Sequence, residues 1–98
     1  SNNYSKAIYS PQFDIPSGIT KRVSQSFAKI EFTVDTKGFA KDFIVADSAG
    51  HDRFDKAVIE HIKKSRYAPK FVDGKAVESQ NWYKFKFSAV GSTTWINR

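Results

Sequence analysis

The feature that most constrains this fold is an amphipathic stretch in the middle of the chain, from about residue 52 to residue 66. Asp52 is expected to be the N-cap of a helix there, with Asp55 in the first turn, where the helix dipole favours a carboxylate. Pro69 disfavours the helical conformation at Ala68, so the helix should end by about Arg66. Apolar or small residues recur at helical spacing and form a single stripe, which must cover an apolar surface: Phe54, Ala57, Val58, His61, Ile62 and Ser65.

A β-hairpin is predicted before this helix. Strict alternation places four apolar residues on one side of a first strand, and the polar residues between them on the other. Residues 35–38 are typical of a turn, with Gly38 at the position that needs a positive φ. A two-residue period then resumes in a second strand. The apolar positions of the two strands are Ala28, Ile30, Phe32, Val34, Phe39, Phe43 and Val45.

A third, long strand is predicted after the helix, from about residue 77 to residue 90, beyond a turn at residues 72–75. Because the helix reverses the direction of the chain, this strand is antiparallel to the first strand and should lie beside it, at an edge of the sheet. Its aromatic residues should face the helix and its lysines the opposite side. The predicted fold is therefore α+β, a three-stranded antiparallel sheet with helices packed on one face.

The length of 98 residues and a hydrophobic content of 40% suit one small domain. We expect an extended N-terminal arm over residues 1–15, whose first two residues read as an expression scar, a folded domain over residues 16–90, and a C-terminal tail over residues 91–98. A short helix capped by Ser17 is expected at residues 17–23. The tail, which contains Trp95, is expected to extend the last strand, pack back on the sheet or be disordered.

The net charge of +6 indicates either an acidic partner or an ordinary basic surface. Alternating rings and lysines in the third strand are also found in RNA-binding sheets, where exposed rings stack on bases. Here the rings are needed to cover the helix stripe, so we expect them in the core and expect no nucleic-acid partner. The sequence has no cysteine, which fits the cytoplasm or the periplasm.

No catalytic, cofactor or metal site is predicted. The carboxylates and histidines nearest to one another are His51, Asp52, Asp55 and His61, but none of the common metal-ligand spacings is present. No serine lies in a motif that would supply a base, and the chain has no glycine-rich phosphate loop. We therefore expect a protein that is not an enzyme.

An ordered set of short motifs resembles the C-terminal domain of the TonB energy-transducing family. Pro16, the alternating first strand, Gly38 and the second strand are followed at the family's spacing by several further pieces. These are Ser48-Ala49-Gly50, Phe54-Asp55, Ala57-Val58, Arg66-Tyr67-Ala68-Pro69, and Gly74 with Val77. The resemblance covers residues 16–90. His61 and Ser65 depart from it, with the large group one helical turn earlier than is usual.

The resemblance implies a periplasmic domain, anchored in the inner membrane through a segment outside this sequence and coupled to a proton-channel complex of the ExbB/ExbD type. It would bind the N-terminal segment of TonB-dependent outer-membrane receptors by β-strand addition to the third strand, for uptake of siderophores or similar nutrients. A TolA-like or other envelope scaffold without receptor binding is the alternative, and open strand edges also allow a homodimer. The expected partner-binding residues are Ser79, Gln80, Asn81, Trp82, Tyr83, Lys84, Phe85, Lys86 and Phe87, with Arg66 and Tyr67 as further candidates.

Overall fold

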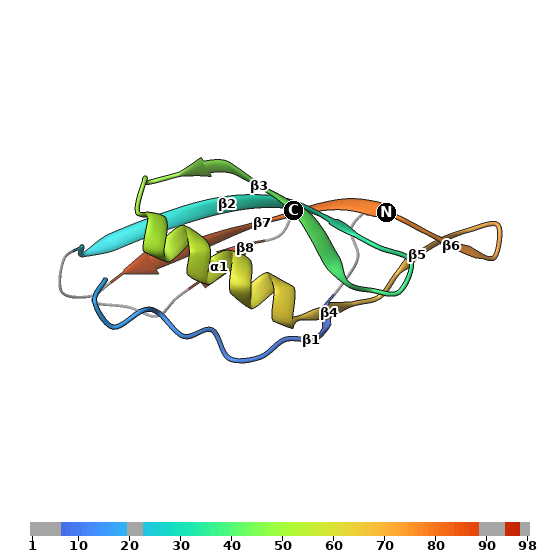
Figure 1. The fold of residues 1–98 in the computed structure, drawn as a ribbon, viewed down its shortest axis with the longest axis horizontal. Helices are drawn as coiled ribbons and strands as arrows, with labels where there is room; N and C mark the ends of the chain where they lie inside the picture. Colours follow the sequence, from blue (N-terminus) through green and yellow to red (C-terminus); the bar gives the residue numbers. More distant parts are fainter. Residues whose placement is uncertain (1–6, 20–22, 89–93, 97–98) are drawn as a thin grey trace.

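The computed structural model of the protein describes residues 7–19, 23–88 and 94–96. Within these ranges one helix, α1 (Asp52–Lys64), lies against a four-stranded antiparallel sheet of order β3-β2-β7-β8 (Figure 1). The sheet consists of β2 (Gln25–Val34), β3 (Ala40–Ser48), β7 (Ser79–Ser88) and the short β8 (Thr94–Ile96). The predicted α+β class, with three long antiparallel strands and the helix on one face, is confirmed.

The strand β7 lies beside β2, as the reversal of the chain by α1 predicts. Its register with β2 is unbroken, from Val34 opposite Ser79 to Gln25 opposite Ser88. The other neighbour of β2 is β3, with Val34 opposite Ala40 at the turn and Ala28 opposite Ser48 at the far end. The predicted hairpin of β2 and β3 is therefore confirmed.

The expectation that the third strand forms an edge of the sheet is wrong over part of its length. The short strand β8 pairs antiparallel with β7, on the side away from β2. The paired residues are Lys84 with Ile96, Phe85 with Trp95, and Lys86 with Thr94. Threonine, tryptophan and isoleucine all favour strands, and a long edge strand is normally covered in some way. Of the three roles expected for the tail, pairing with the sheet is the one observed.

The helix α1 begins one residue earlier than the capping pattern predicts. His51 is the N-cap, with extended backbone angles and no capping hydrogen bond from its side chain, and Asp52 is the first helical residue. The helix ends at Lys64, and Ser65 as C-cap returns the chain to an extended conformation. The exit before Pro69 therefore lies where the sequence predicts.

The core lies between α1 and the inner face of the sheet. The predicted helix stripe supplies Phe54, Val58 and Ile62, each fully buried. The inner positions of the strands and the residues beyond the helix complete the core, namely Ala28, Ile30, Phe32, Val34, Tyr67, Tyr83, Phe85 and Phe87. The rings of β7 are thus core residues, as the need to cover the helix predicts.

The described part of the N-terminal arm, residues 7–15, lies along the helix (Figure 1). Its strand β1 (Ala7–Tyr9) pairs antiparallel with β4 (Arg66–Tyr67), directly after the helix. Farther along the arm, Phe13 packs edge-on against Phe54 and His61, at ring-centroid distances of 6.1 and 5.4 Å. The arm therefore closes one side of the core.

The short helix predicted at residues 17–23 lies partly outside the described residues. Residues 17–19 form a turn in which the Ile19 N–H donates to the Pro16 carbonyl at 3.0 Å. After the main helix, the predicted turn at residues 72–75 joins two short strands that the sequence pattern does not predict. These strands, β5 (Lys70–Val72) and β6 (Lys75–Val77), form a hairpin at one end of the long axis (Figure 1).

Candidate functional site

The predicted partner-binding residues lie on β7, and the alternation of the sequence sorts them between the two faces of the sheet. Tyr83, Phe85 and Phe87 face the core and are nearly inaccessible to solvent. Ser79 and Asn81 are also buried on that face, where the Asn81 side-chain amide donates to the carbonyl and the hydroxyl oxygen of Ser79, both at 3.3 Å. These five side chains fix β7 in place, so any contribution they make to binding comes through their backbone.

The outer face of β7 carries the side chains that solvent, and therefore a bound peptide, can reach. Lys29 of β2 lies over the ring of Trp82, with Nζ 4.5 Å from the ring centroid. Lys84 lies over the ring of Phe27 at 5.1 Å. Lys29 and Lys84 are directly opposite each other across the strands, so each cation leans diagonally onto an aromatic ring. The outer face is therefore basic and aromatic.

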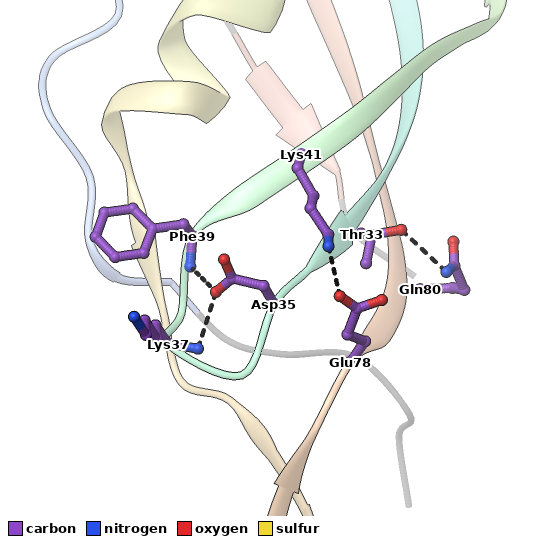
Figure 2. Close-up of polar contacts among 7 residues, drawn as sticks. All are labelled: Thr33, Asp35, Lys37, Phe39, Lys41, Glu78 and Gln80. Carbon is purple, nitrogen blue, oxygen red and sulfur yellow. Dashed lines mark hydrogen bonds and ion pairs between the residues drawn. The ribbon is translucent and has the colours of Figure 1, made fainter.

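The start of β7, together with Glu78 just before it, is tied to the hairpin of β2 and β3 by polar contacts (Figure 2). The Gln80 amide donates to the Thr33 hydroxyl at 3.0 Å, and Lys41 forms an ion pair with Glu78 at 2.5 Å. The hydrogen bond and the charge of Glu78 raise the pKa of Lys41 above its ordinary value. Both contacts join β7 to its neighbours on the side away from β8.

The flank of β7 that faces away from β2 is the surface for which strand addition is expected. Of the described strands, β8 pairs with this flank over only three residues, from Lys84 to Lys86. The strand β7 itself is ten residues long. The pairing on this flank is thus much shorter than the pairing with β2.

The two further candidates, Arg66 and Tyr67, are brought together by β4 but lie apart from that flank. The Tyr67 side chain is buried between Phe32 and Tyr83, at ring-centroid distances of 5.5 and 6.0 Å. Burial raises the pKa of the Tyr67 hydroxyl above its ordinary value, with Tyr83 adding to the effect. Tyr67 therefore anchors the core, whereas Arg66 remains half-exposed at the surface.

Arg66 contacts both the end of the helix and the turn between β2 and β3. Its Nη1 donates to the carbonyls of Ser65 at 2.9 Å and Lys63 at 3.3 Å. Its guanidinium lies 4.3 Å from the centroid of the Phe39 ring. A cation in this position stabilises the carboxyl-terminal end of a helix.

The histidines and carboxylates considered for a metal do not converge. Within the described residues, there is no group of three or more His, Cys, Asp or Glu side chains that could hold a metal ion. His51 Nδ1 and the Ser26 hydroxyl are 2.8 Å apart, whereas His61 Nε2 lies 3.2 Å from the Ser10 hydroxyl. Each histidine thus contacts a different serine.

Asp55 is a buried carboxylate in the first turns of α1, with Oδ1 lacking a hydrogen-bond partner among the described residues. Burial raises the pKa of Asp55, and a hydrogen bond with Ser48 acts in the opposite direction.

Two features near β7 were not found by sequence reasoning. The pairing of β8 is one, although Thr94-Trp95-Ile96 carries a strand signal. The packing of Phe13 on Phe85 at a ring-centroid distance of 5.4 Å is the other. Phe13 stands in a segment without periodicity, so nothing local identifies it as a core residue.

The fold and the geometry of β7 define an α+β domain in which β7 pairs with β2 along its whole length and with β8 at Lys84 to Lys86. The family model described as Gram-negative bacterial TonB protein C-terminal matches residues 20–88, which is more than half of the chain. The chain therefore belongs to the TonB C-terminal domain family.

The solved structures that are similar to this chain include two TonB proteins. The solution NMR structure of the TonB C-terminal domain of Pseudomonas aeruginosa has a TM-score of 0.64 and 22% identity, covering 95% of this chain and 83% of that one. The TonB2 protein from Vibrio anguillarum has a TM-score of 0.57 and 31% identity, covering 99% of this chain and 82% of that one. A search of curated proteins finds no match. No helix among residues 7–19, 23–88 and 94–96 is long and apolar enough to cross a membrane.

Proposed function

We propose that this domain is the periplasmic, non-enzymatic part of a TonB-type energy transducer. It binds the N-terminal segment of TonB-dependent outer-membrane receptors by adding the receptor peptide as a strand to β7. The rest of the protein would be anchored in the inner membrane, coupled to a proton-channel complex of the ExbB/ExbD type, and would transmit energy for uptake of siderophores or similar nutrients. Membership of the family supports this proposal.

The observation that carries the binding mode is that the flank of β7 away from β2 accepts a short antiparallel strand, β8. The strand β7 is held by β2 over its whole length, so it is a rigid template for another strand. On the other flank, β8 supplies pairing for only three residues. A receptor peptide that takes the place of β8 pairs with the same backbone groups at Lys84 to Lys86, and its main-chain hydrogen bonds supply the affinity.

The side chains that provide selectivity are then those on the outer face of β7, chiefly Trp82, Lys84 and Lys86. Trp82 and Lys84 are half-buried, and Lys86 is exposed. A peptide beside β7 places alternate side chains on this same face. Main-chain pairing therefore supplies affinity, and the basic and aromatic outer face favours peptides with acidic or apolar residues at alternate positions.

The test is a titration of the ¹⁵N-labelled domain with synthetic N-terminal peptides of TonB-dependent receptors, followed by backbone-amide NMR shifts. We expect shifts that cluster on residues 79–88 and 94–96. Two N-methylated versions of a binding peptide are compared. One carries N-methyl groups at the odd-numbered residues of the peptide, and the other carries them at the even-numbered residues. Strand addition predicts that one series abolishes binding and the other does not, because only alternate N–H groups face β7.

Equal affinity of both N-methylated series would contradict strand addition. The TolA-like scaffold alternative predicts no shifts with any receptor peptide in a folded sample. Because the methyl groups are on the peptide, the folding of the domain is the same in the two titrations.

A further inference from the structure

The turn between β2 and β3 is held rigidly and presents an exposed aromatic ring. Asp35 Oδ1 accepts hydrogen bonds from the backbone N–H groups of Lys37 at 2.8 Å and Phe39 at 2.9 Å (Figure 2). These hydrogen bonds, led by that from Phe39, lower the pKa of Asp35. The Tyr67 N–H also donates to the Gly38 carbonyl at 3.0 Å, which docks the turn on β4. Despite these constraints, 43% of the Phe39 side chain is exposed.

Two cations from the end of the helix lie over rings of this hairpin. The Arg66 guanidinium lies over Phe39, and the Lys63 Nζ lies 5.7 Å from the centroid of Phe43. Arg66 is held by two backbone carbonyls in addition to the ring, so its position is set before any partner arrives. We call the surface formed by Lys37, Phe39, Lys63 and Arg66 the Phe39–Arg66 patch.

The charge of the patch is positive. The three cations of the patch outnumber the two acids that contact this region, Asp35, which accepts the two backbone N–H groups, and Glu60, which lies 3.5 Å from Lys63. Arginine and aromatic residues are the ones that dominate binding energy at protein interfaces, and groups that are already ordered lose little entropy on binding. A positive, aromatic and pre-organised surface fits an acidic peptide with an apolar side chain.

We propose that the Phe39–Arg66 patch is a second protein-docking surface, which binds an acidic peptide segment bearing an aromatic residue. The aromatic residue packs on Phe39, and the carboxylates pair with Arg66 and the lysines. The proposal does not depend on strand addition to β7. The patch lies at the turn between β2 and β3, whereas the flank for strand addition lies beyond β7 on the side away from β2. Both surfaces can therefore be occupied together.

The probe is the N-acetylated, C-amidated peptide Asp-Glu-Phe-Asp-Glu, titrated at millimolar concentration and physiological salt into the ¹⁵N-labelled domain. Its neutral counterpart, Asn-Gln-Phe-Asn-Gln, is the control peptide. We expect shifts of the backbone amides of residues 37–39 and 63–66 with the acidic peptide and none with the neutral one. Phe39→Ser and Arg66→Gln should each weaken binding by about tenfold, because each removes one of the two main contacts.

Matched variants on the β5–β6 hairpin test whether the effect is specific to the patch. Phe71 is 63% exposed and Lys70 is exposed next to it, so Phe71→Ser and Lys70→Gln remove the same chemistry elsewhere on the surface. Both should leave the affinity unchanged. If Arg66→Gln unfolds the domain by freeing the end of α1, Phe39→Ser still tests the proposal, since its side chain is half-exposed.

Three results would overturn the proposal. The first is the absence of shifts at the patch at millimolar acidic peptide. The second is an equal loss of affinity in Lys70→Gln and in the patch variants, which would show diffuse attraction to any lysine. The third is binding of the neutral peptide with the same strength, which would show that the cations play no part.

Discussion

Gly38 illustrates how one residue joins two distant segments. It has a φ of +91°, and a Cβ built on it would collide with the Tyr67 carbonyl oxygen. Its own carbonyl accepts the Tyr67 N–H at 3.0 Å. The turn between β2 and β3 can thus reach β4 only because residue 38 has no side chain.

Gly38→Ala should therefore lower the free energy of unfolding by about 3 kcal/mol, from the strained φ and the collision together. Gly74→Ala is the matched control, since Gly74 also has a positive φ of +78° but nothing within 4 Å of the added Cβ. It should cost only about 1 kcal/mol. Urea unfolding measures both values, and equal losses would show that the contact with Tyr67 is not important.

His61 is the titratable residue that contacts the arm most closely. It is 7% exposed and lies edge-on to Phe13 and Phe85, with Nε2 facing the Ser10 hydroxyl. Burial lowers the pKa of His61, and the charge of Lys64 acts in the same direction. Lys64 and Glu60 on the helix and Asp14 on the arm are the charged residues lining the cleft beside it.

A histidine whose pKa is lowered in the folded state stabilises the fold above the unfolded pKa, and this contribution is lost as the pH falls through 6.5 toward the folded pKa. The domain should thus lose stability between pH 7.5 and pH 5, by about 1.4 kcal/mol for each unit by which the pKa is lowered. His61→Gln should lose less over the same interval. Urea unfolding at both pH values tests this, and equal losses in the two proteins would contradict it.

The elements divide into those specified by their own pattern and those that depend on a partner segment. The helix α1 and the strands β2 and β7 follow the periodicity of their residues, and their buried positions are the predicted ones. The strand β3 lies where the sequence predicts, but its side chains do not follow the predicted alternation. Its register with β2 shifts twice, and Asp42 has a φ of +55°. As a result, Phe39 and Val45 are partly exposed although their spacing suggests the inner face.

The N-terminal arm is an element held chiefly by one side chain. Phe13 contacts Phe54, His61 and Phe85, whereas the pairing of β1 with β4 involves few residues. Phe13→Ala should lower the free energy of unfolding by about 2 kcal/mol, less than for a fully buried ring because Phe13 is half-buried.

The same substitution should also detach the arm locally. Hydrogen exchange of the amides of residues 7–9 should become faster than in the unaltered protein, while exchange in β2 and β7 changes only by the global loss of stability. Ile8→Ala is the control, since Ile8 is 69% exposed on the same arm. Arm amides that exchange no faster in Phe13→Ala than in Ile8→Ala would show that Phe13 does not hold the arm.

Across the whole molecule, stability should be concentrated in the sheet and helix and not in the β5–β6 hairpin. Phe85 is fully buried in the core, whereas Phe71 is 63% exposed on that hairpin. Phe85→Ala should lower the free energy of unfolding by about 4 kcal/mol, and Phe71→Ala by no more than about 0.5 kcal/mol. Comparable losses in thermal or urea unfolding would mean that the hairpin is integral to the core.

The sequence by itself determined the helix with its stripe, the hairpin, the position of β7 beside β2, and the burial of the rings of β7. These follow from local periodicity, since a repeat of 3.6 or 2 residues fixes which side chains share a face. The predicted binding strand and the predicted end of the helix at about Arg66 rest on the same local signals. The receptor and the binding mode stay predictions.

The tertiary structure alone decided the rest: the pairing of β8 with β7, the pairing of β1 with β4, the place of Phe13 in the core, and the position of Arg66 over Phe39. Three of these four join segments far apart in the chain, whereas β8 is the next strand after β7. Short strands of two or three residues carry too little pattern to show their partners, and they form only where another segment offers an unpaired backbone or an apolar gap. Long-range contacts of this kind become visible only once the chain has folded.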